Sequence, residues 1–195
     1  MAIDLNVIEG LKLALEQREK KHIRVGGAIS FGTFKWRVLA KENGMALLIT
    51  EDIIDQRAYN DGVAKVTWET CTLHEYLNGE EFKKNFSDEE WEKIKRWRID
   101  NPKNPKYDID GGNPTTDRVF LLSIQEAERY FKDNKGRAAK FNGEAAWWWL
   151  RSPGYIQDIA ADVLGDGGVN LNGNTVTNSS GGVRPALWLN LESGI

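Results

Sequence analysis

Trp147-Trp148-Trp149-Leu150-Arg151-Ser152-Pro153-Gly154 opens the most informative part of this chain, and Gly181-Gly182-Val183-Arg184-Pro185-Ala186-Leu187-Trp188-Leu189 closes it. Both stretches combine large apolar side chains with proline, which is typical of buried and stiff backbone. Residues 153–183, called the polar segment below, contain no Lys, Arg or Glu, and Gly, Asn, Asp, Ser and Thr dominate. A solvent-facing strand normally carries long charged side chains, so their absence needs its own explanation.

The polar segment has the spacing of short strands joined by turns. Val163, Val169 and Val176 are six and seven residues apart, and glycines stand between them. This pattern predicts strands that reverse at glycine. We expect the three valines and Ala160 and Ala161 to point inward. Two interpretations are open: a solvated β-meander, or a recognition surface, since antibody paratopes also favour Tyr, Ser, Gly and Asn.

The codons offer a second reason for this composition. Substitution of the adenines in an Asn codon that ends in a pyrimidine gives Asn, Asp, Ser, Thr, Ile, Tyr, Leu, Val, Ala or Gly, among others, but never Lys, Glu or Trp. Gln157 falls outside this set. Twelve other positions belong to it: Tyr155, Ile156, Asp158, Ile159, Asp162, Leu164, Asn170, Leu171, Asn172, Asn174, Thr175 and Asn178.

The two flanks and the segment between them resemble the variable proteins of diversity-generating retroelements, which occur in phages and bacteria. In that family, a reverse transcriptase with adenine-specific errors rewrites the 3′ end of the target gene. The resemblance implies a C-type-lectin fold whose rewritten side chains form a ligand-binding face. Residues 29–39, 46–51 and 120–123 also resemble a widespread uncharacterised bacterial domain. Together, the resemblances cover roughly residues 25–191.

The resemblance assigns roles to residues at both flanks and between them. The scaffold would include Trp149, Leu150, Arg151, Ser152, Gly182, Val183, Arg184 and Pro185. Arg151 and Arg184 can each tie loop carbonyls or a carboxylate together, or bind an anionic ligand directly. The ligand-binding positions would be Tyr155, Ile156, Gln157, Asp158, Ile159, Asp162, Leu164, Asn170, Leu171, Asn172, Asn174, Thr175, Asn178 and Ser179.

The rest of the chain predicts a mixed α+β domain. Strands are expected at 29–39, with a turn near Gly32, at 45–50 after the turn Asn43-Gly44, and at 119–122. Helices are expected at 67–76 and after two capping boxes, Ser87 to Glu90 and Ser123 to Glu126. Residues 100–117 form a long loop. Strands at both ends and helices in the middle favour short helices, long loops, and a mixed or antiparallel sheet closed by both termini.

Residues 4–22 predict an amphipathic helix capped by Asp4, with Leu5, Ile8, Leu11 and Leu15 on one stripe. That stripe packs on the domain itself or on another copy of the chain. We therefore divide the sequence into this N-terminal part, 1–24, and a ligand-binding domain, 25–195. The second interpretation makes the protein a homo-oligomer, in which several copies would strengthen weak contacts.

The charge and composition of the chain argue against several classes of binding and metal site. A net charge of −3 leaves no basic footprint for nucleic acid. No secretory signal and no apolar run of membrane-spanning length is visible, which predicts no membrane insertion. The single cysteine, Cys71, excludes an intrachain disulfide and a thiolate metal cage. We expect no cofactor and no metal.

Three other functions are alternatives to simple ligand binding. The C-type-lectin fold resembles that of the formylglycine-generating enzymes, but their oxidative chemistry uses paired cysteines, and this chain has only Cys71. We expect His22 and His74 to be solvated or structural, so the sequence predicts no enzyme. Calcium-dependent sugar lectins use Glu-Pro-Asn, Gln-Pro-Asp and Trp-Asn-Asp motifs, which are absent. Asp158, Asp162 and Asp166 are spaced by four but lack the surrounding ligand pattern. An assembly role is compatible with binding. The expected partner is a protein or a cell-surface ligand.

Overall fold

Consecutive hairpins open the described part of the chain. The computed structural model describes residues 8, 10 and 23–192. β1 (Ala28–Phe31), β2 (Phe34–Glu42) and β3 (Met45–Thr50) pair antiparallel in chain order. Asn43 and Gly44 both have positive φ, 49° and 71°, which suits the tight turn that joins twisted strands. The predicted hairpins are confirmed. The expected helix over 4–22 lies outside the described residues, apart from Ile8 and Gly10.

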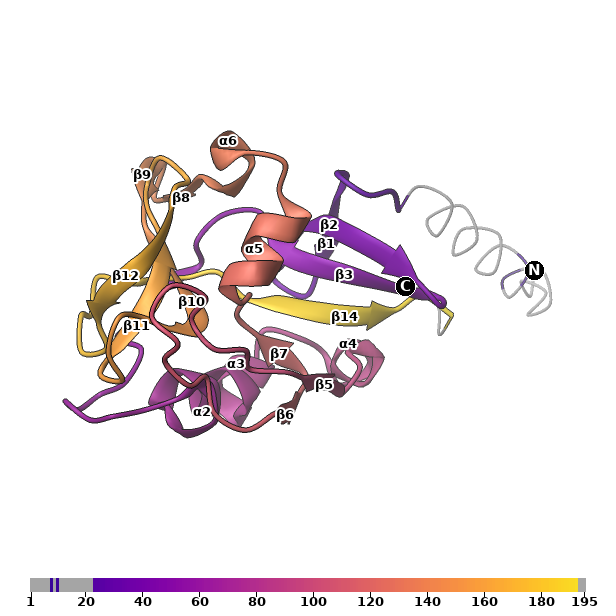
Figure 1. Ribbon diagram of the computed structural model, residues 1–195. Helices are drawn as coiled ribbons and strands as arrows, with labels where there is room; N and C mark the ends of the chain where they lie inside the picture. The colour runs from indigo at the N-terminus through magenta and orange to yellow at the C-terminus, as the bar shows by residue number, and fades with distance from the viewer. Residues whose placement is uncertain (1–7, 9, 11–22, 193–195) are drawn as a thin grey trace.

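The C-terminal strand completes this first sheet. β14 (Ala186–Asn190) lies between β3 and β7 (Val119–Phe120) and pairs antiparallel with both, giving the order β1-β2-β3-β14-β7. Figure 1 shows β14, in yellow, running alongside the indigo and purple hairpin. Both ends of the domain therefore meet in one sheet, as predicted. The sheet remains open, however, because β1 and β7 are its edges.

A second sheet holds the polar segment. Its order is β12-β11-β10-β13-β4, and only the β10–β13 pair is parallel. In Figure 1, the orange strands of this sheet stand at the opposite end of the molecule from the turn that joins β2 to β3 and from the C-terminal end of β14. The strands are β4 (Asp55–Gln56), β10 (Trp148–Pro153), β11 (Ile159–Val163), β12 (Val169–Thr175) and β13 (Gly182–Val183).

The helices are few and short, which confirms the mixed α+β class. Both predicted capping boxes form: the Glu90 and Glu126 backbone amides donate to the hydroxyls of Ser87 and Ser123, each at 3.2 Å. The helical elements are η1 (Trp68–Thr70), α2 (Thr72–Asn78), α3 (Glu80–Lys83), α4 (Asp88–Lys93), α5 (Ile124–Tyr130) and α6 (Asn134–Arg137). Two small hairpins join β5 (Trp97–Ile99) to β6 (Thr115–Asp117) and β8 (Ala139–Phe141) to β9 (Glu144–Ala146).

Three predicted elements differ from the structure. The helix expected over 67–76 is split at Cys71, whose extended backbone (φ −82°, ψ 150°) ends η1 and begins α2. The strand expected over 119–122 pairs only at β7, because the backbone carbonyls of Leu121 and Leu122 turn to Arg151 instead. The long loop over 100–117 ends early, since Thr115–Asp117 pair with β5 as β6.

The core runs continuously between the two sheets. β3 and β14 are buried along almost their whole length, as expected for strands covered on both faces. Four tryptophans have no exposed surface: Trp36, Trp68, Trp148 and Trp149. Large aromatic side chains bury more apolar area than any others, so these residues contribute strongly to folding without help from the polar segment.

Candidate functional site

The backbone of the polar segment is fixed by small buried side chains. Ala160, Ala161, Val163 and Val176 are at most 2% exposed, which confirms that they point inward. Val169 is only partly buried but packs against the core. β11 lies between β10 and β12, and it is buried without interruption from Ala160 to Val163. The polar segment is therefore an ordered part of the sheet.

Most of the predicted ligand-binding residues lie in β12 and in the loops of the polar segment, outside the buried strand β11. Tyr155, Ile156 and Leu164 are the most open of the large apolar ones, at 46%, 42% and 42% exposure. Asn172, Thr175 and Ser179 are also exposed. The half-buried positions are Gln157, Asp158, Ile159, Asn170, Leu171, Asn174 and Asn178. The structure thus brings thirteen of the fourteen residues to full or partial exposure, in one continuous segment.

Asp162 is the exception, and its expected place on the ligand-binding face is corrected. Its side chain has 0% exposure. Oδ2 accepts hydrogen bonds from the side-chain amides of Asn170, at 3.1 Å, and Asn174, at 3.0 Å, while Oδ1 has no partner. Burial raises the pKa of this carboxyl to about 6, and the two amides only partly offset it. A pairing shift between Ala160 and Asp162 turns the carboxyl under β12.

Several half-buried positions also make contacts within the domain. The Gln157 side-chain amide donates to the backbone carbonyls of Val66, at 3.0 Å, and Asp110, at 3.1 Å. Leu171 packs against the core. Gly154 lies so close to Ile159 that a Cβ there would stand 2.3 Å from the Ile159 methyl group. Gln157, Ile159 and Leu171 therefore support the backbone as well as border the open surface.

Arg184 holds the end of the polar segment to the first sheet. Its guanidinium donates to the backbone carbonyls of Thr50, Glu51 and Arg137, at 2.9–3.0 Å, and lies over the Trp148 ring. Burial, with the nearby Arg37 charge, lowers the pKa of Arg184 to about 10, so it remains charged at neutral pH. The prediction that Arg184 ties loop carbonyls is confirmed. Because the side chain is 0% exposed, a ligand anion has no access to it.

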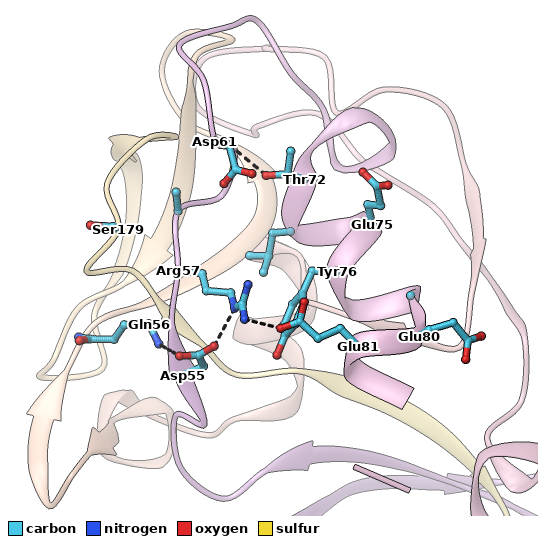
Figure 2. Close-up of a pocket in the computed structure, with 13 residues that line it drawn as sticks. Asp55, Gln56, Arg57, Asp61, Thr72, Glu75, Tyr76, Glu80, Glu81 and Ser179 are labelled. Atoms are coloured by element: carbon cyan, nitrogen blue, oxygen red, sulfur yellow. Dashed lines mark hydrogen bonds and ion pairs between the residues drawn. The ribbon is translucent and has the colours of Figure 1, made fainter. Parts of the chain in front are cut away.

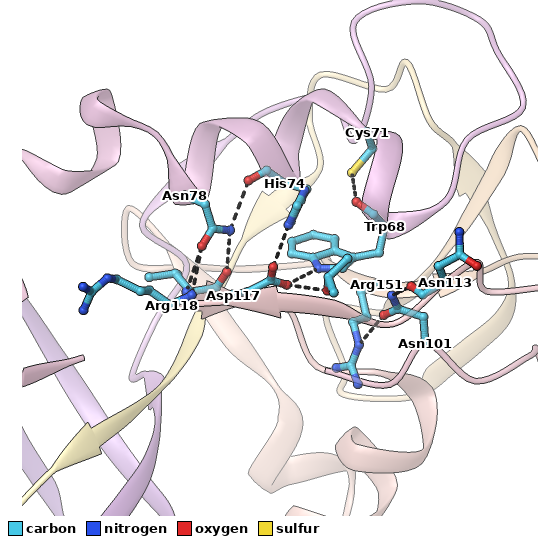
Figure 3. A network of polar contacts seen from close by, with 11 residues as sticks. Trp68, Cys71, His74, Asn78, Asn101, Asn113, Asp117, Arg118 and Arg151 are labelled. Carbon is cyan, nitrogen blue, oxygen red and sulfur yellow. Dashed lines mark hydrogen bonds and ion pairs between the residues drawn. The ribbon is translucent and has the colours of Figure 1, made fainter. Parts of the chain in front are cut away.

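Arg151 performs the same task at the start of the segment. It donates to the carbonyls of Leu121 and Asp100, both at 2.8 Å, to the Asn101 side chain at 3.1 Å, and to the Glu126 carboxylate. Figure 3 shows its contact with Asn101. It is 3% exposed. Both predicted roles, tying carbonyls and tying a carboxylate, therefore occur at this residue.

Trp149 and Ser152 complete the predicted scaffold. The Trp149 indole N–H donates to the Arg57 carbonyl at 2.8 Å. A Cβ on Gly181 would stand 1.9 Å from that indole nitrogen, so only glycine fits where the chain passes over the ring. The Ser152 hydroxyl accepts the backbone N–H of Ile124 at 3.0 Å, where α5 begins.

A cleft of about 700 Å³ lies beside the polar segment, which contributes Ser179 to its lining (Figure 2). Arg57 occupies its floor, 3.7 Å from the centre of the Tyr76 ring, and is paired with Asp55 at 2.7 Å and Glu81 at 2.9 Å. Three further carboxylates line the walls: Asp61, Glu75 and Glu80. The cleft is negatively charged overall, and its cation is already neutralised.

The histidine in the described chain belongs to a buried polar network (Figure 3). The His74 ring nitrogen lies 2.9 Å from Asp117, which also accepts from the Trp68 indole at 2.8 Å. Its partners lower the pKa of Asp117, despite its burial. Cys71 lies one helical turn away, but burial raises the pKa of its thiol to about 12. A protonated, buried thiol is a poor nucleophile, so the geometry indicates a structural network. His22 lies outside the described residues.

The described residues hold neither a metal-binding cluster nor a membrane-spanning helix. Across the residues that the structure describes, no three His, Cys, Asp or Glu side chains gather closely enough to hold a metal ion. Asp158, Asp162 and Asp166 do not form such a group. No helix within residues 23–192 is long and apolar enough to span a membrane.

Sequence analysis missed one group of residues beside the polar segment. Asn104 is 0% exposed, and its side-chain amide donates to the carbonyls of Pro153, Gly154 and Leu171 at 2.9–3.2 Å. Tyr107, three residues later, touches Tyr155 and Asn172. The only sequence signal was a loop rich in Asn, Pro and Asp, which says nothing of its contacts.

Comparison with family models supplies the assignment. Residues 43–191 match the model of a domain of unknown function, DUF6273. The chain belongs to the DUF6273 family. Searches of the curated proteins and of the solved structures gave no match. The DUF6273 match covers β3 to β14, and therefore includes the second sheet, the polar segment and both arginine anchors.

Proposed function

We propose that this DUF6273 protein is a ligand-binding, receptor-type protein whose polar segment recognises variable targets, and that the segment is diversified in the gene by retroelement-driven adenine mutagenesis. We further propose that the domain is C-type-lectin-like. The division of the segment carries the proposal: small buried apolar side chains hold the backbone, while short polar side chains and Tyr155, Ile156 and Leu164 stay open. Such a surface can change its side chains without changing its fold.

Three features support the proposal. The anchors Arg151 and Arg184 bind backbone carbonyls outside the segment, so its ends are held independently of its sequence. Four of the thirteen open or half-buried positions are Asn and one is Tyr, types that serve adaptable recognition. Twelve positions also fit codons reached by adenine substitution from Asn codons. The proposed partner is a protein or a cell-surface ligand, and no catalytic residue is assigned.

Deep sequencing of this gene from a population of its host tests the diversification. We expect substitutions to cluster at adenines in codons 155–179 and to stop before codon 182. Codons 97–118 make a matched control, because they are also rich in Asn and Asp. Similar substitution rates in both windows, or a uniform 155–179 window, would contradict diversification.

The alternative is a C-type-lectin-like binding or structural module of fixed specificity, in a phage or a bacterium. The buried Asp162 supports the fixed-specificity alternative at position 162, because a fully buried, hydrogen-bonded side chain belongs to the framework of the domain and not to its variable surface. A uniform population would select this alternative.

A further inference from the structure

The loop that carries Tyr107 lies against the polar segment. We infer that Tyr107 is a permanent aromatic anchor of the proposed ligand-binding face, and that it seats an apolar or aromatic side chain of a partner protein. The inference rests on the proposed function, since it names a fixed contact residue and the chemistry of the partner for the same surface. Tyr107 lies 46 residues before the first residue of the polar segment, Pro153.

Asn104 makes the loop rigid. Its amide nitrogen binds three carbonyls of the polar segment, and its side-chain oxygen accepts the backbone N–H groups of Lys106, at 3.0 Å, and Tyr107, at 3.3 Å. The backbone closes on itself as well, because the Asn104 N–H donates to the Ile109 carbonyl at 2.9 Å. One buried side chain thus sets the distance between Tyr107 and the segment. A preordered contact residue loses little entropy on binding.

Tyr107 itself lies against residues that the proposal treats as variable. Its ring meets the Tyr155 ring edge to face, with centroids 6.2 Å apart and planes at 66°. Its hydroxyl donates to the side-chain oxygen of Asn172. Lys106 lies over the ring, with its ammonium 4.8 Å from the ring centre. Tyr107 keeps partial exposure despite these contacts, so part of it faces the same solvent as Tyr155.

The surroundings of Tyr107 indicate the partner's chemistry. Six large apolar side chains are exposed in the described chain, and three of them belong to the polar segment: Tyr155, Ile156 and Leu164. Tyr155 and Ile156 lie at the Tyr107 end. Exposed apolar residues placed together, with polar amides around them, are typical of a protein-binding surface. Tyrosine offers contact area and a hydrogen bond at low entropic cost, so it suits the fixed centre of a variable surface.

The test uses a library of the full-length chain on a display system, with lysozyme as the probe protein. Codons 155, 156, 158, 164, 175 and 178 are randomised, while Tyr107, Asn172 and the two Asp162 partners Asn170 and Asn174 stay unchanged. Lysozyme binders are selected, and each then receives Tyr107→Ala, Tyr107→Phe or Tyr130→Ala. Tyr130 is the matched control, because it is a half-buried tyrosine on α5.

We expect Tyr107→Ala to weaken lysozyme binding by about tenfold in most clones, the loss typical of a contact residue of moderate energy. Tyr107→Phe keeps the ring and loses only the hydroxyl, so the dissociation constant should rise less than about threefold. Tyr130→Ala should leave it within about twofold, as for residues outside a contact surface. If Tyr107→Ala also changes binding less than about twofold while the clones stay folded, the inference is wrong although the proposed function stands.

Hydrogen exchange of the unmutated binders keeps the test decisive if Tyr107→Ala unfolds. Backbone amides of residues 106–110 should exchange more slowly when lysozyme is bound. Unchanged exchange there, with slower exchange only in residues 155–179, would overturn the inference. A library that gives no lysozyme binder at all would instead contradict the proposed function, and the inference with it.

Discussion

Single buried polar residues determine how the polar segment is held. Arg151, Arg184 and Asn104 are each at most 3% exposed, and each binds at least two backbone carbonyls. A buried carbonyl without a hydrogen-bond partner costs about 1–3 kcal/mol of stability. Removing one of these three side chains would leave at least two carbonyls unpaired, so the loss of stability would exceed the net contribution of the hydrogen bonds themselves. Asp162 differs from them, because one of its oxygens has no partner.

Asp162 gives the domain a pH-dependent stability. Burial raises its pKa in the folded state to about 6, above the ordinary 3.8. The folded state therefore holds this proton more tightly, and the resulting stability is lost as the pH rises from about 4 through about 6. Asp162→Asn cannot ionise. The free energy of unfolding of this variant, minus that of the wild type, should grow by about 2 kcal/mol between pH 4 and pH 7.

Denaturant unfolding at several pH values measures that difference, in which the titration of all other groups cancels. Asp158→Asn, at a half-buried position, is the matched control. A difference for Asp162→Asn that stays flat from pH 4 to pH 7 would show that the carboxyl is not desolvated.

Local sequence signals predicted some residues well and others poorly. Asn43-Gly44, Ser87 and Ser123 work through neighbours within three residues, so the turn and both capping boxes were readable. Asp162 depends on a pairing shift in β11, which alternation does not reveal. The contact of Tyr107 with Asn172 spans 65 residues and arises only when a loop without periodicity folds against the sheet.

At the scale of elements, the edge strand β12 contains both exposed positions whose side chains can change and a glycine that cannot be replaced. Asn172 and Thr175 are exposed, whereas Gly173 between them has a positive φ of 81°. A Cβ on Gly173 would stand 2.2 Å from the Ala160 carbonyl oxygen. The freedom of the polar segment therefore belongs to its outward side chains and not to the glycine that shapes the backbone of β12.

Gly173→Ala should lower the free energy of unfolding by at least about 2 kcal/mol, because it combines a strained backbone with a steric clash. Thr175→Ala, two residues away on the same strand, should change it by less than about 0.5 kcal/mol, as is usual for surface substitutions. Thermal or denaturant unfolding of both variants checks the prediction. Equal effects would mean that β12 relaxes around the new methyl group.

The elements themselves were foreseen unequally. The hairpins of β1, β2 and β3 and the helices α4 and α5 have clear patterns, and the sequence predicted each of them. The pairs β4–β13 and β5–β6 have two or three residues per strand, too few for periodicity to emerge. Cys71 splits a predicted helix because Thr67 and Thr70 close a single turn before it.

At the scale of the whole molecule, the segment before residue 23 remains to be assigned a role. The described domain begins with Ile23, which is 4% exposed. The Ile23 carbonyl accepts a hydrogen bond from the Lys41 ammonium at 2.8 Å. Deleting residues 1–22 keeps this contact, so the domain should unfold at nearly the same temperature. If the apolar stripe joins copies of the chain, the deletion should lower the number of copies.

Sedimentation of the full chain and of the deleted chain measures this number directly. Leu11→Asp in the full chain is a control that disrupts the stripe without shortening the protein. The assembly role is wrong if all three proteins sediment with the same number of copies.

The position of β14 determines which mutations in the polar segment still give a folded protein. This strand is encoded after the polar segment, yet it lies inside the first sheet, between β3 and β7, and its residues 186–189 are at most 5% exposed. A premature stop codon or a shifted reading frame anywhere in the segment deletes β14 and leaves a gap in the middle of that sheet. The faulty product cannot fold, and cellular proteases remove unfolded chains. Because β14 is encoded after the polar segment, only genes whose reading frame is intact through the segment yield a folded protein that escapes proteolysis.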